Sequence, residues 1–133
     1  MTIGYRLLLA FSMTFGFCGG LVAQADVPSG APVTILEMPL RYQDWPERRS
    51  AHAMLELDPV RAVLSVFSEK EGQNVIVRHP GGDGGNAWAL EFREWLVALG
   101  VPSYFITLEP GSGGADRLLI LVEAMLTAFD SSA

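Results

Sequence analysis

The residues best suited to bind a ligand gather in one segment, "RHPGGDGGNAW", which covers residues 78–88. Bare backbone amides ahead of a helix attract an anion, because the N–H groups of the first turn lack partners inside the helix. An acid in the same segment opposes an anion but can receive an amine. A ligand that carries both an ammonium and a carboxylate therefore suits this segment together with an arginine further along the helix. The candidate ligand-binding residues are His79, Asp83, Gly84, Gly85, Asn86 and Arg93.

The same segment has a purely structural interpretation. Glycines between a strand and a helix often supply left-handed backbone that a tight turn needs. In that case Asn86 only caps the helix that follows. The sequence leaves both interpretations open.

A nucleotide site is a third interpretation of these glycines. Residues 82–87 fit G-x-G-x-x-A, and Glu109 closes the next expected strand, where a dinucleotide-binding fold places its ribose-binding acid. The spacing to Glu109 is longer than the usual ~20 residues. The chain also lacks the G-x-x-x-x-G-K-[ST] motif with its phosphate-binding lysine. We therefore expect no cofactor.

Catalytic and metal-binding patterns are weak. His79 and Asp83 lie four residues apart, but His52 is remote, and no H-x-x-x-H pair or cysteine cluster is present. A Ser-His-Asp arrangement could use Ser103 or Ser112, yet neither stands in G-x-S-x-G. We expect no metal ligand and no catalytic residue, and hence a protein that binds rather than catalyses.

The first 25 residues have the layout of a secretory signal peptide. Arg6 is their only charge, residues 7–22 are apolar, and Ala23-Gln24-Ala25 offers a small-x-small cleavage site. An uncleaved membrane anchor is one alternative, although the apolar run is shorter than the ~20 residues of a spanning helix. A lipid-modified Cys18 is another. We expect cleavage after Ala25 and a periplasmic or secreted protein.

The chain after Ala25 has 108 residues, the size of one domain. Residues 26–32 form a linker that contains two prolines, and residues 33–133 form a single domain. All 15 acidic residues but only 8 of the 9 basic ones follow Ala25, which gives this part a net charge of −7. Such a charge disfavours nucleic acid and anionic lipid surfaces. Membrane contact is expected only if the N-terminal segment stays uncleaved.

Hydrophobic spacing and turn residues predict the elements of the domain. Helical spacing, capping residues and proline predict the helices, and short β-branched runs predict the strands. We expect strands at 33–38, 74–79, 103–108 and 118–122, a short helix at 48–55 after an Asp44 cap, and longer helices at 58–71 and 86–99. Residues 53–57 would also serve as a strand. Trp88 and Trp95 share the buried face of the last helix, which leaves Trp45 as the tryptophan open to ligand contact.

This order predicts an α/β fold, an α+β two-layer sandwich with the order β-(α)-α-β-α-β-β. Strand–helix–strand crossovers require parallel neighbouring strands and right-handed connections. We therefore expect a small mixed sheet of about four strands with helices on one face. The last two strands follow one another through a short glycine-rich turn, "PGSGG", and should run antiparallel.

Between residues 74 and 122 the chain resembles the OmpA-like C-terminal domain, an envelope module that binds peptidoglycan. The likeness lies in "NVIVRH", a glycine-rich loop, "EWLVALGVPS", "YFITL" and a final apolar strand. The family's Gly-His-Thr-Asp loop and Leu-Ser-x-x-Arg-Ala motif are missing, and only Asp83 and Arg93 stand near its ligand pair. The resemblance implies a cell-envelope protein whose partner is a peptidoglycan stem peptide or another envelope protein. The alternative is a periplasmic protein–protein interaction module without glycan binding.

Overall fold

The computed structural model describes residues 30–69 and 73–125. The expected signal peptide therefore lies outside the described residues, and Pro32, the last residue of the expected linker, already belongs to the first strand. The strands are β1 (Pro32–Arg41), β2 (Gln73–His79), β3 (Ile106–Pro110) and β4 (Arg117–Met125). The α-helices are α1 (Ala51–Leu55), α2 (Asp58–Glu69) and α3 (Asp83–Ala98), and the short 3-10 helices are η1 (Tyr42–Asp44) and η2 (Ser103–Phe105). This order confirms the predicted succession of elements.

The four strands form one mixed sheet in the order β1-β4-β2-β3. β2 and β3 are parallel, as a helix crossover requires, and β4 runs antiparallel to both β1 and β2. The expected opposite direction of the last two strands is confirmed. They are not neighbours, however, because β2 lies between them. The glycine-rich turn after β3 thus carries the chain past β2 to the middle of the sheet.

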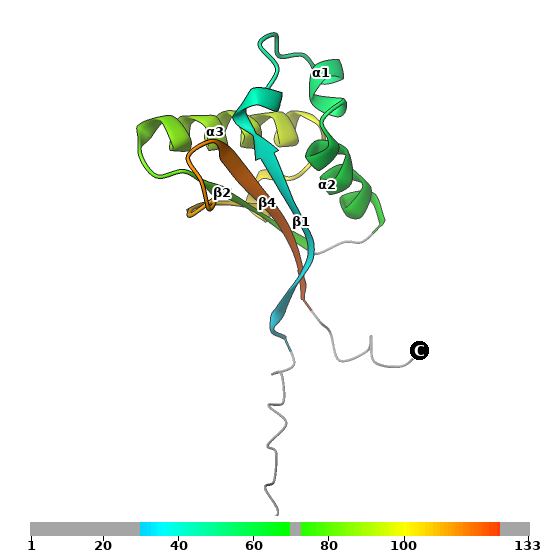
Figure 1. The fold of residues 1–133 in the computed structure, drawn as a ribbon. Helices are drawn as coiled ribbons and strands as arrows, with labels where there is room; N and C mark the ends of the chain where they lie inside the picture. Colours follow the sequence, from blue (N-terminus) through cyan, green and yellow to red (C-terminus); the bar gives the residue numbers. More distant parts are fainter. Residues whose placement is uncertain (1–29, 70–72, 126–133) are drawn as a thin grey trace, which may run out of the picture.

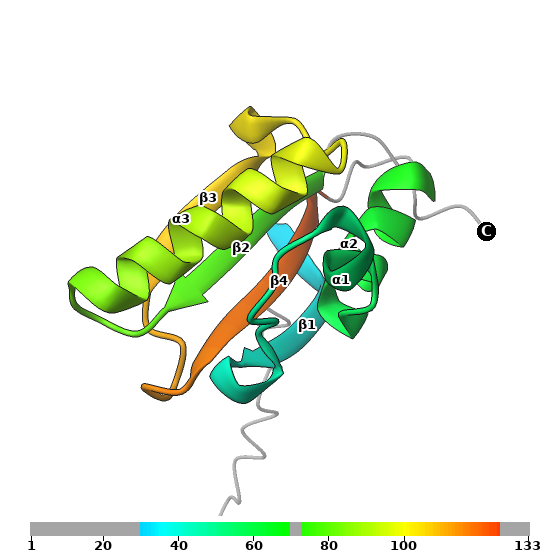
Figure 2. The same cartoon turned by 90° about the horizontal axis from the view of Figure 1, so that it is seen from above.

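The helices cover one face of this sheet, so the protein has two layers (Figures 1 and 2). Period-2 alternation along each strand sends every second side chain toward the helices. The core between the layers contains buried side chains from all four strands and from all three α-helices, among them Leu40, Met54, Val63, Val77, Phe92, Ile106 and Ile120. The α/β two-layer fold expected from the sequence is therefore present.

Helix α3 begins earlier than expected. Its N-cap is Gly82, with a φ of 88°, and the helix starts at Asp83 rather than after Asn86. The prediction that Asn86 caps the helix is wrong, because the Asn86 amide already donates to the Gly82 carbonyl at 3.1 Å. A left-handed residue at this position favours glycine, which has no Cβ to clash. Three residues assigned to the loop, 83–85, thus form the first turn of α3.

Two further boundaries differ from the expectation. Ser50, and not Asp44, caps α1, since its Oγ accepts the Ala53 amide at 3.1 Å. The expected strand at 103–108 splits into η2 and β3, so that β3 starts at Ile106. Aromatic residues raise β propensity, but Pro102 accepts the Phe105 amide and closes a 3-10 turn instead. The expected helix within 48–55 is confirmed as α1, although it is shorter than predicted.

Gln73 at the start of β2 is buried in a position that offers its side chain no hydrogen-bond partner within residues 30–69 and 73–125. Its exposed fraction is 1%, and neither its Nε2 nor its Oε1 forms a hydrogen bond among the described residues. A buried polar group without a partner costs about 1–3 kcal/mol. We expect Gln73→Met, which keeps a similar volume, to raise the free energy of unfolding by about 1–2 kcal/mol in urea denaturation.

The adjacent Asn74 provides the control for this prediction, because it is an amide residue on the same strand but is exposed. Asn74→Met should change the free energy of unfolding by less than about 0.5 kcal/mol. A loss of stability in Gln73→Met would contradict the prediction, because it would show that the Gln73 side-chain amide forms hydrogen bonds in the folded protein in solution.

Candidate functional site

The carboxyl ends of the three parallel strands meet at one edge of the sheet. β1 ends at Arg41, β2 at His79 and β3 at Pro110, and the segments that follow them are η1, the turn into α3 and the turn into β4. In open α/β sheets, ligands bind outside this edge, because the loops there present unpaired backbone groups. The two glycine-rich turns of the sequence therefore belong to a single surface.

Three hollows lie along this surface. The His79 cavity, of about 270 Å³, lies between the two glycine-rich turns and is lined by residues 79–81 and 111–115. The Trp88 cavity, of about 380 Å³, is lined by Tyr42, Pro80, Gly81, Gly84, Gly85, Trp88 and Ala115. The Trp45 cavity, of about 410 Å³, is lined by Tyr42, Gln43, Trp45, Pro46, Glu47 and Arg49. Shared lining residues connect them in a row, with Tyr42 between the second and the third.

Hydrogen bonds around His79 hold the two glycine-rich turns together. The His79 carbonyl accepts the amides of Gly111 and Ser112, at 2.9 and 3.3 Å. The His79 Nδ1 lies 2.7 Å from the Pro80 carbonyl and must donate to it, because a carbonyl oxygen only accepts. Ser112 is buried and donates its Oγ to the Gly114 carbonyl at 2.8 Å. His79 therefore anchors the turns and lines the cavity between them.

The first turn of α3 presents unpaired amides at the Trp88 cavity. The first backbone hydrogen bond of the helix comes from Asn86, and Gly82 has no side chain with which to cap the turn. The amides of residues 83–85 therefore have no partner inside the helix. Gly85 allows the turn to pass close to Pro80, since a Cβ at position 85 would lie 1.9 Å from the Pro80 carbonyl oxygen.

Trp88 lies one turn further along α3 and carries a second unpaired donor. The residue is 7% exposed, and its Nε1 forms no hydrogen bond among the described residues. Buried indole N–H groups usually find a partner. The ring of Tyr42 stands edge-on to the Trp88 ring, with centroids 5.2 Å apart and an interplanar angle of 89°. Tyr42 itself is 63% exposed, so a solvated side chain covers the buried indole.

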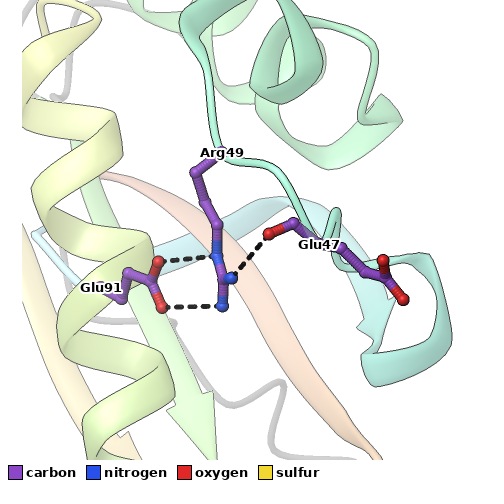
Figure 3. Close-up of polar contacts among 3 residues, drawn as sticks. All are labelled: Glu47, Arg49 and Glu91. Carbon is purple, nitrogen blue, oxygen red and sulfur yellow. Dashed lines mark hydrogen bonds and ion pairs between the residues drawn. The ribbon is translucent and has the colours of Figure 1, made fainter.

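A strap of irregular backbone, residues 45–50, runs from η1 to α1 beside α3. Trp45 is buried in it against the rings of Trp88 and Phe92, both at 6.1 Å. Arg49 holds the strap to α3, because its guanidinium bonds both carboxylate oxygens of Glu91, at 2.9 and 3.4 Å, as Figure 3 shows. The same guanidinium donates to the Glu47 carbonyl at 3.0 Å and lies 5.7 Å from the Trp45 ring centroid.

A pair of opposite charges follows Ala115, a lining residue of the Trp88 cavity, in the chain. The Arg117 guanidinium donates to the Asp116 carboxylate at 3.1 Å and lowers the pKa of that carboxyl group below its ordinary value. The Asp116 carbonyl accepts the Tyr42 amide at 2.7 Å. This contact ties η1 to the turn into β4 and sets the position of Tyr42 at the site.

The sequence-predicted site residues divide into two groups. His79, Gly84 and Gly85 line the cavities at the strand ends. Asp83 and Asn86 lie on the exposed side of the first turn of α3 and line none of these three hollows. Arg93 lies ten residues beyond Asp83, about 15 Å along the helix axis, and bonds Glu94 at 3.2 Å. Asp83 and Arg93 therefore do not contact each other.

Ser112 and His79 line the same cavity, but each bonds a backbone carbonyl, and no hydrogen bond joins their side chains. Ser103 belongs to η2, at the opposite end of the sheet. Glu109, at the position where a dinucleotide-binding fold would place its ribose-binding acid, bonds Arg78 at 3.5 Å on the sheet face away from α3. Within residues 30–69 and 73–125, no group of three His, Cys, Asp or Glu side chains could hold a metal ion.

Sequence reasoning missed Tyr42 and Ala115 as members of the site. Tyr42 follows the carboxyl end of β1, and Ala115 closes the second glycine-rich turn. The direction of the strands could have indicated that these two residues belong to the site, because the turns that follow parallel strands meet at one edge of the sheet. The exposed position of Tyr42 beside Trp88 depends on η1, whose three residues carry no periodic pattern.

The chain is thus a two-layer α/β domain with a row of hollows at the carboxyl edge of its sheet. No protein-family model matches it, and no curated protein matches its sequence. Among the described residues, no helix combines the length and the apolar character needed to cross a membrane.

Proposed function

We propose that this protein is a non-catalytic binding protein of the cell envelope that holds a cell-wall stem peptide at the carboxyl edge of its sheet. The observation that carries the proposal is the meeting of two glycine-rich turns around connected hollows of about 270 and 380 Å³. Hollows of this size accept a short peptide. The glycines that line them expose backbone N–H and C=O groups, which can form hydrogen bonds with a ligand.

The charges around the first turn of α3 fit a ligand with both signs. The unpaired amides and the positive end of the helix dipole attract a carboxylate. Asp83, exposed in the same turn, can bind an ammonium group. Stem peptides of peptidoglycan carry both groups. The segments by which the sequence resembles the OmpA-like domain fold as β2, α3, β3 and β4.

The proposed location follows from the N-terminal 25 residues. Their apolar run and small-x-small site direct the chain out of the cytoplasm, and cleavage after Ala25 would release a periplasmic or secreted protein. A binding protein for cell-wall peptide has its ligand in that compartment. Mass measurement of the protein recovered from cells tests this part, since the mass expected for the chain starting at Asp26 differs from that of the full chain.

Co-sedimentation with purified sacculi tests the binding. We expect the protein to be retained in the pellet, and we expect Asp83→Ala and Arg93→Ala to lower the retained fraction. Asp83 and Arg93 line none of the three hollows, so each substitution removes a charged group that the ligand would reach only where it extends from the hollows along α3. Such a contact is worth roughly tenfold in affinity. Free stem peptide added in excess should release the bound protein.

Leu90→Ala is the matched control, because Leu90 is 43% exposed on the same helix and carries no charge that a zwitterionic ligand could bind. It should sediment like the unmodified protein. Absence of retention by the unmodified protein would refute cell-wall binding.

A second candidate function is protein–protein interaction in the envelope. The specific observation behind it is the outer edge of the sheet, where β1 pairs only with β4. Large apolar side chains are exposed at the start of β1 and the end of the neighbouring β4. They belong to Val33, Ile35 and Met125, with exposed fractions of 36%, 46% and 49%. An edge strand with one free hydrogen-bonding side and exposed apolar residues can accept a strand from another protein. Substituting Ile35 by lysine would weaken such a contact and leave sacculus retention unchanged.

A further inference from the structure

We propose that the Trp88 cavity is a carboxylate subsite in which the indole Nε1 of Trp88 and the amides of the first turn of α3 bind the anionic end of a peptide ligand. This inference rests on the proposed function for the identity of the ligand as a peptide. It adds a residue, Trp88, and a chemical group, the carboxylate, that the sequence alone does not assign to a site.

Three hydrogen-bond donors of the residues that line this cavity form no hydrogen bond among the described residues. The amides of Gly84 and Gly85 precede the first hydrogen bond of the helix, and the Trp88 Nε1 has no partner among the described residues. The Pro80 carbonyl already accepts the His79 ring. None of the side chains that line the cavity is acidic or basic. A ligand that completes these bonds must therefore supply acceptor oxygens, and a carboxylate supplies two.

The buried indole donor is an observation independent of the helix end. An unpaired Trp88 N–H at 7% exposure costs the folded protein stability, because water no longer solvates it. A bound carboxylate would recover that cost and would add a charge-assisted hydrogen bond. The same site would gain little from a neutral apolar ligand. The preference for a carboxylate over its amide is therefore the central property of the subsite.

Tyr42 controls access to Trp88. Its ring covers the indole edge-on at 5.2 Å, and it also separates this cavity from the Trp45 cavity. Its backbone is fixed by the bond from its amide to the Asp116 carbonyl, while its side chain is 63% exposed. Rotation of the side chain alone would open the indole to a ligand. The rest of the peptide would then lie in the Trp45 cavity.

Gly84 leaves room at the mouth of the cavity. A Cβ at this position would have no heavy atom within 4 Å, and the backbone there does not require glycine. A glycine within a helix that has no packing role normally weakens the helix relative to alanine, and Gly84 is the second residue of α3. Its lack of a side chain keeps the amides of the first turn accessible. Gly84→Ala should consequently obstruct the ligand without disturbing the fold.

Two matched probes test the subsite, N-acetyl-alanyl-alanine with a free carboxylate and the same dipeptide as its C-terminal amide. Binding is followed by the indole N–H resonances of the ¹⁵N-labelled protein, and loss of one resonance in Trp88→Phe assigns that residue. We expect the carboxylate probe to shift the Trp88 resonance, and the amide to bind at least about tenfold more weakly. Gly84→Ala should weaken the carboxylate probe by a similar factor.

Trp95→Phe is the matched control, because it removes an indole N–H from the same helix at a residue that does not line the cavity. It should leave the affinity for the carboxylate probe unchanged. Equal binding of the two probes, or a Trp88 resonance that does not move, would overturn the subsite even if sacculi retain the protein. A carboxylate-dependent shift without sacculus retention would support the subsite and refute the cell-wall proposal.

Discussion

Replacing Phe92 by alanine should lower the free energy of unfolding by about 3–5 kcal/mol. Phe92 is fully buried in the middle of α3, and its ring packs 6.1 Å from that of Trp45. The substitution removes the apolar area of a phenyl ring and leaves a cavity that the sheet below cannot fill. Since a domain of this size is stable by about 5–15 kcal/mol, the variant should lose a large part of its stability. Urea unfolding followed by far-UV circular dichroism measures the change.

Leu90→Ala again serves as the control for Phe92→Ala. It shortens an apolar side chain on the same helix, two residues away, but at a position that is 43% exposed. The expected change is within about 0.5 kcal/mol. A loss below about 1 kcal/mol in Phe92→Ala would contradict the packing of α3 against the strap and the sheet.

Alanine at the adjacent glycines 84 and 85 should change stability in opposite directions. Gly85→Ala is expected to lower the free energy of unfolding by at least about 2 kcal/mol, because the new Cβ would lie 1.9 Å from the Pro80 oxygen and 2.8 Å from the Pro80 carbonyl carbon. Both contacts are with backbone, which cannot rotate away. The helix would lose its first turn, or the turn after β2 would move. Thermal and urea unfolding both report the loss.

Gly84→Ala should raise the free energy of unfolding by about 0.5–1 kcal/mol, because alanine favours the helix and meets no atom within 4 Å. The same two variants also separate fold from ligand binding. The Gly84→Ala variant should be more stable than the unmodified protein and bind the carboxylate probe more weakly. The Gly85→Ala variant should lose both stability and affinity for the carboxylate probe. Equal destabilisation by the two substitutions would mean that the chain does not approach itself at Pro80.

The sequence predicted the element order because periodicity and turn residues report local structure directly. Val75 and Val77 in a short β-branched run, and Trp88, Phe92 and Leu96 at helical spacing, each identify an element and its buried face. The position of β4 between β1 and β2 could not be predicted in this way. Strand order depends on contacts between segments far apart in the chain, for which the sequence carries no local pattern.

The candidate site was predicted in part. The glycine-rich turn after β2 was found from composition, and His79, Gly84 and Gly85 do line hollows. Asn86 was misplaced because glycine at an N-cap leaves no side-chain signal, whereas asparagine is a strong one. The sequence could not predict that the Trp88 Nε1 has no hydrogen-bond partner among the described residues. The helical spacing that predicts a core tryptophan says nothing about the partner of its N–H group.

The central position of the final strand has a consequence for the time at which the protein can fold. β1 joins the sheet only through β4, and the register pairs Pro32 with Met125, near the two ends of the described chain. Closing so long a loop is slow, and none of the local elements can substitute for it. A ribosome must therefore release the chain as far as Met125 before the sheet is complete. Late completion of the sheet agrees with the export proposed above, because a narrow translocation pore admits only a chain that has not yet folded.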